Sequence, residues 1–178
     1  MRPAFVVIAL STVVAGCAGS ASPVTQPSTT PTKPRPVRTI VRGAHVVHPG
    51  QAVRLDAQRG VAIRLRATGP KLSRTQLSSS HGYPPAHGYY VTFHVTVVNL
   101  GHKPVGISPD DFATVVQGQG RVTSYEGNAP YSGGARQLDP TELAPGDSVR
   151  APLTFDVSRP HGRFGYYPDR TAAIVWVY

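Results

Sequence analysis

YYVTFHVTVV, residues 89–98, is the strongest strand pattern in the sequence. Its apolar side chains recur at every second position, at Val91, Phe93, Val95 and Val97. Because successive side chains of a strand point to opposite faces, this pattern predicts one face packed in a core and a more polar face turned away from it. The turn-forming run NLGHKP at residues 99–104 then ends the strand.

The same period of two predicts further strands at residues 61–68, 112–116, 121–125, 148–157 and 171–178. Glycine and proline signals separate these segments, and no long amphipathic helix pattern competes with them. We therefore predict an all-β fold, an immunoglobulin-like antiparallel β-sandwich. Its predicted core also includes Val149, Ala151, Leu153, Phe155, Val157, Ile174 and Trp176.

The N-terminus has the pattern of a lipoprotein signal peptide, predicted over residues 1–16. Arg2 is followed by an apolar run at residues 4–14, which is too short to span a bilayer as a helix. The run ends in Val-Ala-Gly-Cys, which resembles a bacterial lipobox and makes Cys17, the only cysteine, the predicted lipid attachment site. A diacylglycerol on Cys17 would hold the chain at the outer face of the plasma membrane.

Residues 17–38 are predicted to be a tether between the lipid and the sandwich. Prolines recur through this segment among Ser, Thr, Ala and Gln, a composition that cannot bury a core and favours extended chain. The remaining residues, 39–178, suit a single domain. With one cysteine in 178 residues, this domain has no internal disulfide and depends on apolar burial.

The charge is strongly basic, with 18 Lys and Arg against 9 Asp and Glu. Such a balance raises nucleic acid as a partner. However, the basic residues are scattered rather than clustered, no recognition motif is present, and an exported protein rarely meets nucleic acid. We expect no nucleic-acid partner, and anionic lipids, a protein or a cell-wall component as neighbours instead.

Several features together resemble a known family. They are Asn-Leu-Gly after the long strand, PDDF at residues 109–112, LAPGDSV at residues 143–149, and LTFDV at residues 153–157. In this order, behind a lipobox and a proline-rich segment, they resemble the immunoglobulin-like domain of unknown function found in Gram-positive and actinobacterial lipoproteins. The resemblance implies a β-sandwich with no established catalytic residues, and therefore a protein that is not an enzyme.

Two segments exceed a minimal sandwich, residues 71–87 and 160–169, and loops are where binding residues concentrate. They offer Tyr83, Arg163, Phe164 and Tyr166, which belong to residue types enriched in binding surfaces. We predict that these four side chains bind a partner. The alternative is that the aromatic residues near 164 form a further strand and pack on the core.

Histidines suggest a second function, the binding of a metal ion or small ligand by residues 81–89, from His81 to Tyr89. His-Gly-Tyr occurs at residues 81–83 and again at 87–89, and imidazole is a common ligand of zinc and copper. No tight ligand spacing accompanies these histidines, so we predict no metal site and no cofactor. The sequence also lacks a Gly-x-Ser-x-Gly elbow and paired carboxylates in a catalytic setting, so no catalytic residue is assigned.

The lipid anchor gives the first testable prediction. Cys17→Ala removes the attachment site, and because Cys17 is separated from the domain by the tether, the stability of the sandwich should not change. Labelling with radioactive palmitate should mark the wild-type chain and leave the variant unlabelled, with equal melting temperatures. Equal labelling of both chains would contradict the assignment of Cys17.

Overall fold

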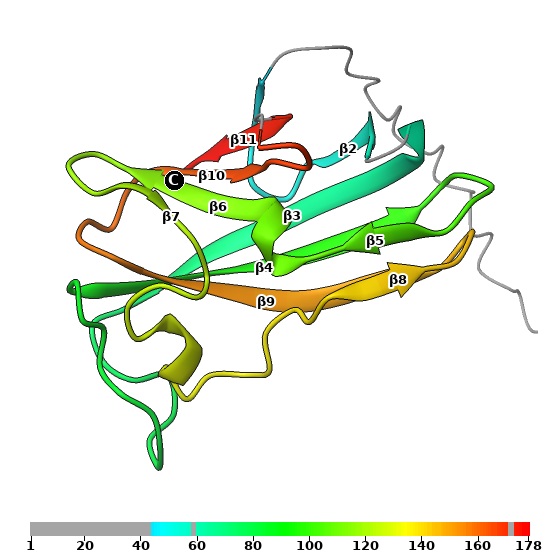
Figure 1. Ribbon diagram of the computed structural model, residues 1–178. Helices are drawn as coiled ribbons and strands as arrows, with labels where there is room; N and C mark the ends of the chain where they lie inside the picture. The colour runs from blue at the N-terminus through cyan, green and yellow to red at the C-terminus, as the bar shows by residue number, and fades with distance from the viewer. Residues whose placement is uncertain (1–43, 58–59, 171–172) are drawn as a thin grey trace, which may run out of the picture. The chain divides into compact units, whose positions relative to one another are not determined.

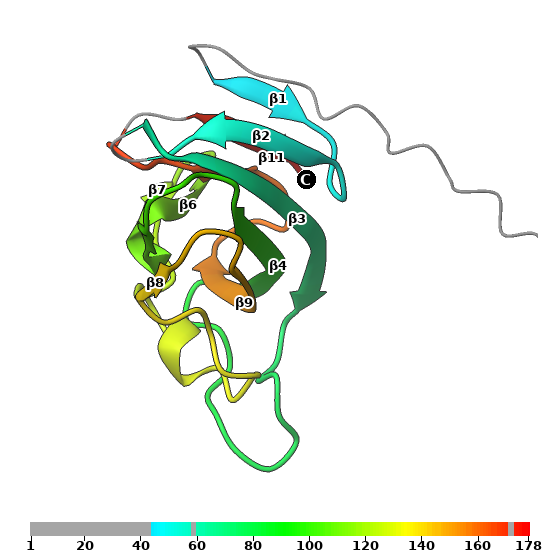
Figure 2. The ribbon, with the colours of Figure 1, turned by 90° about the vertical axis from the view of Figure 1, so that its right-hand side faces the viewer.

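The computed structural model describes residues 44–57, 60–170 and 173–178 (Figures 1 and 2). The predicted signal peptide, Cys17, the tether and residues 39–43 of the predicted domain lie outside the described residues. Within the described residues, no helix is long and apolar enough to cross a membrane.

The described residues form two main sheets and a small third one. The four-stranded sheet is antiparallel, in the order β2 (Ala52–Asp56), β3 (Ala62–Ser73), β4 (Tyr89–Asn99) and β9 (Ser148–Val157). The five-stranded sheet has the order β1 (His45–Val47), β11 (Ile174–Val177), β10 (Arg163–Tyr166), β6 (Phe112–Val116) and β7 (Gly120–Val122). The third pairs β5 (Val105–Ile107) with β8 (Thr141–Leu143).

The all-β sandwich predicted from the sequence is confirmed. One strand pair departs from the antiparallel expectation, because β1 runs parallel to β11. Within the described residues, two short 3-10 helices, η2 (Pro109–Asp111) and η3 (Ala129–Tyr131), interrupt the connections between strands.

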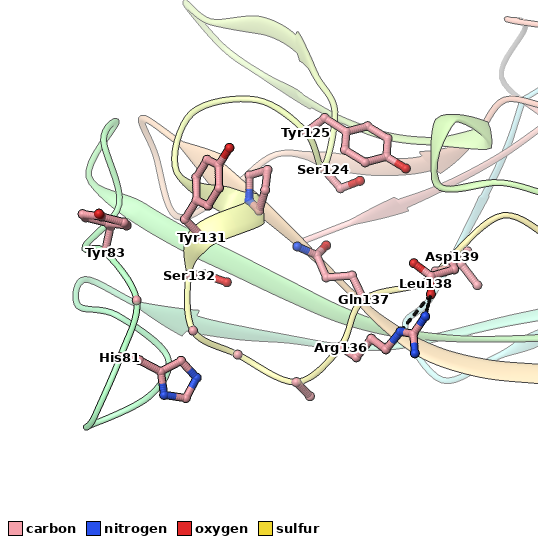
Figure 3. Close-up of a pocket in the computed structure, with 15 residues that line it drawn as sticks. His81, Tyr83, Ser124, Tyr125, Tyr131, Ser132, Arg136, Gln137, Leu138 and Asp139 are labelled. Carbon is pink, nitrogen blue, oxygen red and sulfur yellow. Dashed lines mark hydrogen bonds and ion pairs between the residues drawn. The ribbon is translucent and has the colours of Figure 1, made fainter.

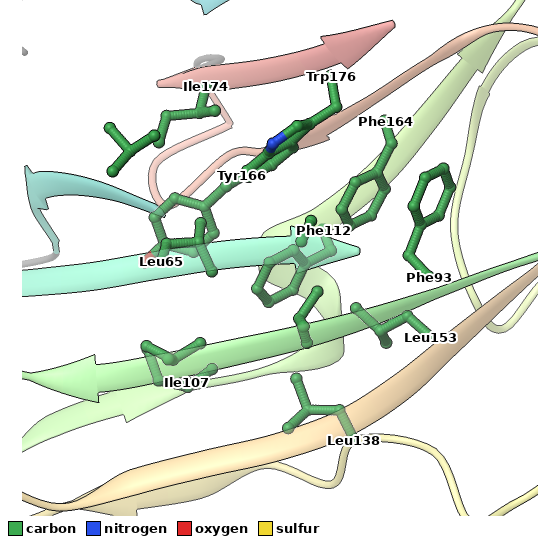
Figure 4. Close-up of a cluster of buried hydrophobic side chains, with 14 of the residues drawn as sticks. Leu65, Phe93, Ile107, Phe112, Leu138, Leu153, Phe164, Tyr166, Ile174 and Trp176 are labelled. Carbon is green, nitrogen blue, oxygen red and sulfur yellow. The ribbon is translucent and has the colours of Figure 1, made fainter. Parts of the chain in front are cut away.

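Aromatic side chains from both sheets meet in the centre of the core (Figure 4). Phe93 of β4 stacks on Phe164 of β10 with ring centroids 4.2 Å apart. Phe164 also lies near Phe112, Phe155 and Trp176. The predicted inward positions of β4 are all fully buried, which confirms the face assigned from the period of two. Val149 and Ala151, by contrast, pack on the core while only partly buried.

Several strand boundaries differ from the prediction. β3 continues through Ser73, so the segment predicted as a loop at residues 71–87 begins inside a strand. The predicted strand at 121–125 ends at Val122 and is followed by turns. Strands β1, β2, β5 and β8 were not predicted, and β10 was predicted only as an alternative. Apart from β2, each is only three or four residues long, too short for a period of two to be recognised.

The other face of the four-stranded sheet is covered at one end only. Tyr90 and Thr92 of β4 point away from the core, and both are buried, whereas His94 on the same face is exposed. Tyr90 lies opposite Asp156 of β9 in the strand register, and Asp156 is also buried. The segments between β3 and β4 and between β7 and β8 account for this burial, and they lie together at one end of the molecule (Figure 1).

The packing of Phe164 gives the second prediction. Phe164→Ala should lower the free energy of unfolding by about 3–5 kcal/mol, because the change leaves a cavity among four aromatic rings. Val177→Ala, at a side chain 53% exposed on β11, is the control and should change it by less than about 0.5 kcal/mol. Urea unfolding measures both. Equal, small effects would show that Phe164 is not a central core residue.

Candidate binding pocket

A pocket of about 580 Å³ opens between residues 81–83 and the segments 124–125 and 130–139 (Figure 3). The first segment belongs to the connection from β3 to β4, and the others belong to the connection from β7 to β8. The pocket is therefore built from two stretches that are about 40 residues apart in the sequence and that the fold brings together. Most of its walls are loops, the parts of a sandwich that are not committed to strand packing.

Three exposed tyrosines give the pocket an aromatic character. Tyr83 and Tyr131 meet edge to face, with ring centroids 6.3 Å apart and an angle of 86° between the ring planes. They are 63% and 62% exposed, and Tyr125 is 54% exposed. Aromatic rings of this size normally bury most of their surface, so rings left on the rim of a pocket present apolar area for contact with another molecule.

The two loops are joined by main-chain hydrogen bonds. The Leu77 amide donates to the Ser132 carbonyl oxygen at 2.7 Å, and the Tyr83 amide donates to the Tyr131 carbonyl oxygen at 2.8 Å. The backbones pass so close that a Cβ atom at Gly133 would overlap the carbonyl group of His81. Tyr83 and Tyr131 are thus held as neighbours by their own backbones and not only by ring contact.

Asp156 of β9 fastens both loops to the sheet. Its buried carboxylate accepts hydrogen bonds from the backbone amides of Ala86 at 2.7 Å, His87 at 2.9 Å and Asn128 at 2.7 Å. The first two amides belong to one loop and the third to the other. A buried carboxylate is costly unless it is hydrogen-bonded, and three amide donors satisfy it. Gly127, with φ +59°, leaves the space that this approach requires.

Tyr90 adds a second fastening beside Asp156. Its hydroxyl group lies 2.8 Å from the carbonyl oxygen of Tyr83 and 3.0 Å from that of Asn128, so it donates between the two loops. Burial, together with the nearby Asp156 carboxylate, raises the pKa of Tyr90 to about 12. The raised pKa means that the hydroxyl, already protonated at neutral pH, stays a donor into the alkaline range as well.

Gln137 holds the far wall of the pocket against β9. Its amide nitrogen donates to the Ala129 carbonyl oxygen at 3.1 Å, and its amide oxygen accepts from the Thr154 backbone at 3.0 Å. At the rim, the exposed side chains of Arg136 and Asp139 form an ion pair, with Arg136 Nε 2.8 Å from Asp139 Oδ2. These polar groups stand beside the tyrosines and can exchange hydrogen bonds with a bound molecule.

The four residues predicted to bind a partner do not come together. Tyr83 lines the pocket, whereas Arg163 is exposed on β10 of the other sheet, where it lines a separate pocket of about 350 Å³. The prediction that Phe164 and Tyr166 offer an accessible surface is wrong, because both are fully buried in β10. The alternative, that these aromatics form a strand over the core, is the correct one. Tyr83 and Arg163 remain as predicted contact residues.

The two histidines of residues 81–89, His81 and His87, have different neighbours. His81 lines the pocket, and its Nδ1 atom lies 3.1 Å from Ser78 Oγ and 3.0 Å from Ser80 Oγ. His87 instead faces Asp156, with Nδ1 3.5 Å from Oδ1. Across residues 44–57, 60–170 and 173–178, no group of three or more His, Cys, Asp or Glu side chains could hold a metal ion.

Sequence reasoning missed Tyr125, Tyr131, Arg136 and Asp139. Tyr125 was assigned to the predicted strand at residues 121–125, and the other three lie in the stretch from residue 126 to 140, whose glycines and prolines indicated only a connection. Tyr125 and Tyr131 themselves could have indicated a binding role, because connections are rich in small and polar residues, whereas tyrosine is enriched in binding surfaces.

Two solved structures have a similar fold. The secreted protein MPT63 from Mycobacterium tuberculosis aligns with a TM-score of 0.57 and 16% identity, over 78% of this chain and all of that one. The putative lipoprotein ycdA from Bacillus subtilis subsp. subtilis str. 168 aligns with a TM-score of 0.50 and 15% identity, over 71% of this chain but only 38% of its own. At these identities the likeness concerns the fold.

No curated protein sequence matches the chain. The family described as a domain of unknown function (DUF4352) matches residues 62–166, which run from the start of β3 to the end of β10 and include every segment that lines the pocket. The match spans more than half of the chain, and the protein belongs to this family.

Proposed function

We propose that this protein is a lipid-anchored envelope lipoprotein whose β-sandwich is a non-enzymatic binding module. Its partner, a protein or a cell-wall component, occupies the pocket between residues 81–83 and 124–139. The observation that carries the proposal is the pair Tyr83 and Tyr131, two exposed rings held in fixed relation by hydrogen bonds between their backbones.

The chemistry of the pocket supports binding of a partner with apolar and polar groups together. Tyrosine contributes a large contact area at little entropic cost, since it has only two rotatable side-chain bonds. Arg136, Asp139 and His81 supply charged and hydrogen-bonding groups around the rings. Because Asp156, Tyr90 and Gln137 already fix the loops, binding need not order them, and this preorganisation favours affinity.

The N-terminal sequence supports the location. The apolar run, the lipobox-like VAGC and the proline-rich residues that follow suit an exported chain that is held at the membrane by Cys17. The fold is shared with a secreted protein and with a protein described as a lipoprotein, which agrees with an extracellular role.

The third prediction tests the pocket. Tyr83→Ser combined with Tyr131→Ser should abolish recovery of the partner when solubilised envelope is passed over immobilised full-length protein, because both rings of the contact are lost. Since the two rings are largely exposed, the melting temperature should stay within a few degrees of the wild type.

Val177→Ser is the control, since it also removes an exposed apolar side chain but on the other sheet. It should retain the partner. A stably folded Tyr83/Tyr131 variant that captures the same partner as the wild type would rule out this pocket as the binding site.

A further inference from the structure

Four arginines gather on the uncovered end of the four-stranded sheet, on the same face as Tyr90 and Asp156 but farther along the strands. They are Arg54 of β2, Arg64 and Arg66 of β3, and Arg150 of β9, and all four are exposed. Each lies between inward-facing buried or partly buried neighbours, so all four side chains point away from the core. We call these four residues the arginine face.

The strand register places these arginines in two adjacent rows. Arg54 lies directly opposite Arg64, and Arg66 lies opposite Thr96, which in turn lies opposite Arg150. Neighbouring strands are about 4.8 Å apart, so Arg66 and Arg150 are separated by about 10 Å at the backbone. Arg64 and Arg66 are two residues apart on one strand, about 7 Å. The face thus concentrates four positive charges in a small area.

This arrangement is unfavourable for the isolated domain. Like charges directly opposite each other on neighbouring strands destabilise a sheet, and Arg54 opposite Arg64 is such a pair. In the described part of the chain no ion pair involves any of the four arginines. Asp56 is the acidic side chain that β2 adds to this face, so four positive charges stand against one negative. A face of this kind is stabilised when an anionic partner covers it.

The chemistry of the face selects phosphate groups over an apolar partner. Large exposed hydrophobic side chains occur elsewhere in the described residues, and none belongs to β2, to β9 or to residues 62–68 of β3. Arginine presents a planar fork of donors that matches phosphate oxygens. The Arg66 Nε donor is already engaged by the Gly50 carbonyl oxygen at 2.8 Å, which orients that guanidinium and leaves its outer nitrogens for a ligand.

We propose that the arginine face docks on the anionic phospholipid headgroups of the membrane to which the chain is attached. The choice of a membrane rests on the proposed anchor at Cys17, whereas the arginine face stands independently of it. A tethered domain stays at high local concentration near the headgroups, so four weak arginine contacts are enough to hold it there. Docking fixes which way the domain faces and depends strongly on ionic strength.

Energy transfer from the arginine face to the lipid headgroups tests the proposal. Full-length protein carrying Ser148→Cys, at an exposed position beside Arg150, is labelled there and added to vesicles with a headgroup dye. Transfer should be high with vesicles containing phosphatidylglycerol, low with pure phosphatidylcholine, and lost in high salt. Co-flotation with the neutral vesicles reports the anchor separately, so a failed anchor and a failed docking give different results.

Paired variants show which arginines act. Each basic group near an anionic surface contributes a factor of about five, so Arg64→Gln with Arg66→Gln should weaken docking about 25-fold. Arg159→Gln with Arg170→Gln removes the same charge from exposed positions outside the face and should leave transfer nearly unchanged. Equal loss in both double variants would overturn the proposal. So would equal transfer in both lipids, or binding of soluble poly(glycerol phosphate) by the arginine face without docking on vesicles, which would indicate a wall polymer instead.

Discussion

The carboxylate of Asp156 is the interaction on which the pocket depends. It accepts hydrogen bonds from three backbone amides, which belong to two loops about 40 residues apart in the sequence. These bonds form on the side of the sheet that faces away from the core. An unpaired carboxylate would not remain buried there, and the loops without it would lose their shared attachment to β9. Tyr83 and Tyr131 lie on the two loops that this buried charge joins to β9, and the backbone bonds between the loops, with Tyr90 and Gln137, complete the support.

One sheet face therefore has two different ends. At the end of Tyr90 and Asp156, loops cover the strands and form the aromatic pocket. At the other end the strands are uncovered and carry the arginine face. The inner face of the same sheet is uniform, since it packs Phe93 and its neighbours against the opposite sheet. Packing fixes one face, and the other is available for recognition.

The core-facing side of the four-stranded sheet could be predicted from the sequence. Val91, Phe93 and Val95 alternate over a long strand, so the period of two assigned β4 and its core side chains correctly. Asp156 and Tyr90 could not be recognised in the same way. They occupy outward positions, where a polar group in a strand pattern indicates contact with solvent, and only the loops that fold over them bury them. Long-range hydrogen bonds of this kind leave no local pattern.

The short strands also limited what could be predicted from the sequence. Phe164 and Tyr166 alternate with Gly165, but four residues after the loop signal of Pro160 and Gly162 are too few to establish a period. Their aromatic character suggested a binding surface, whereas both are buried: Phe164 packs on Phe93 across the sandwich, and Tyr166 packs on Phe112 of the neighbouring strand β6. The pocket residue Tyr131 was not predicted for a different reason. It lies in a turn-rich stretch that has no strand or helix periodicity.

Amide hydrogen exchange in Asp156→Asn tests the central role of this carboxylate most directly. The amides of Leu77 and Tyr83 bond across the two loops and do not touch Asp156. If the carboxylate holds the loops together, both amides should exchange about 10- to 100-fold faster in the variant, as the loss of charged hydrogen bonds implies, while the amides of β4 that pair with β3 remain protected. Unchanged exchange at Leu77 and Tyr83 would show that the loops hold their positions without Asp156.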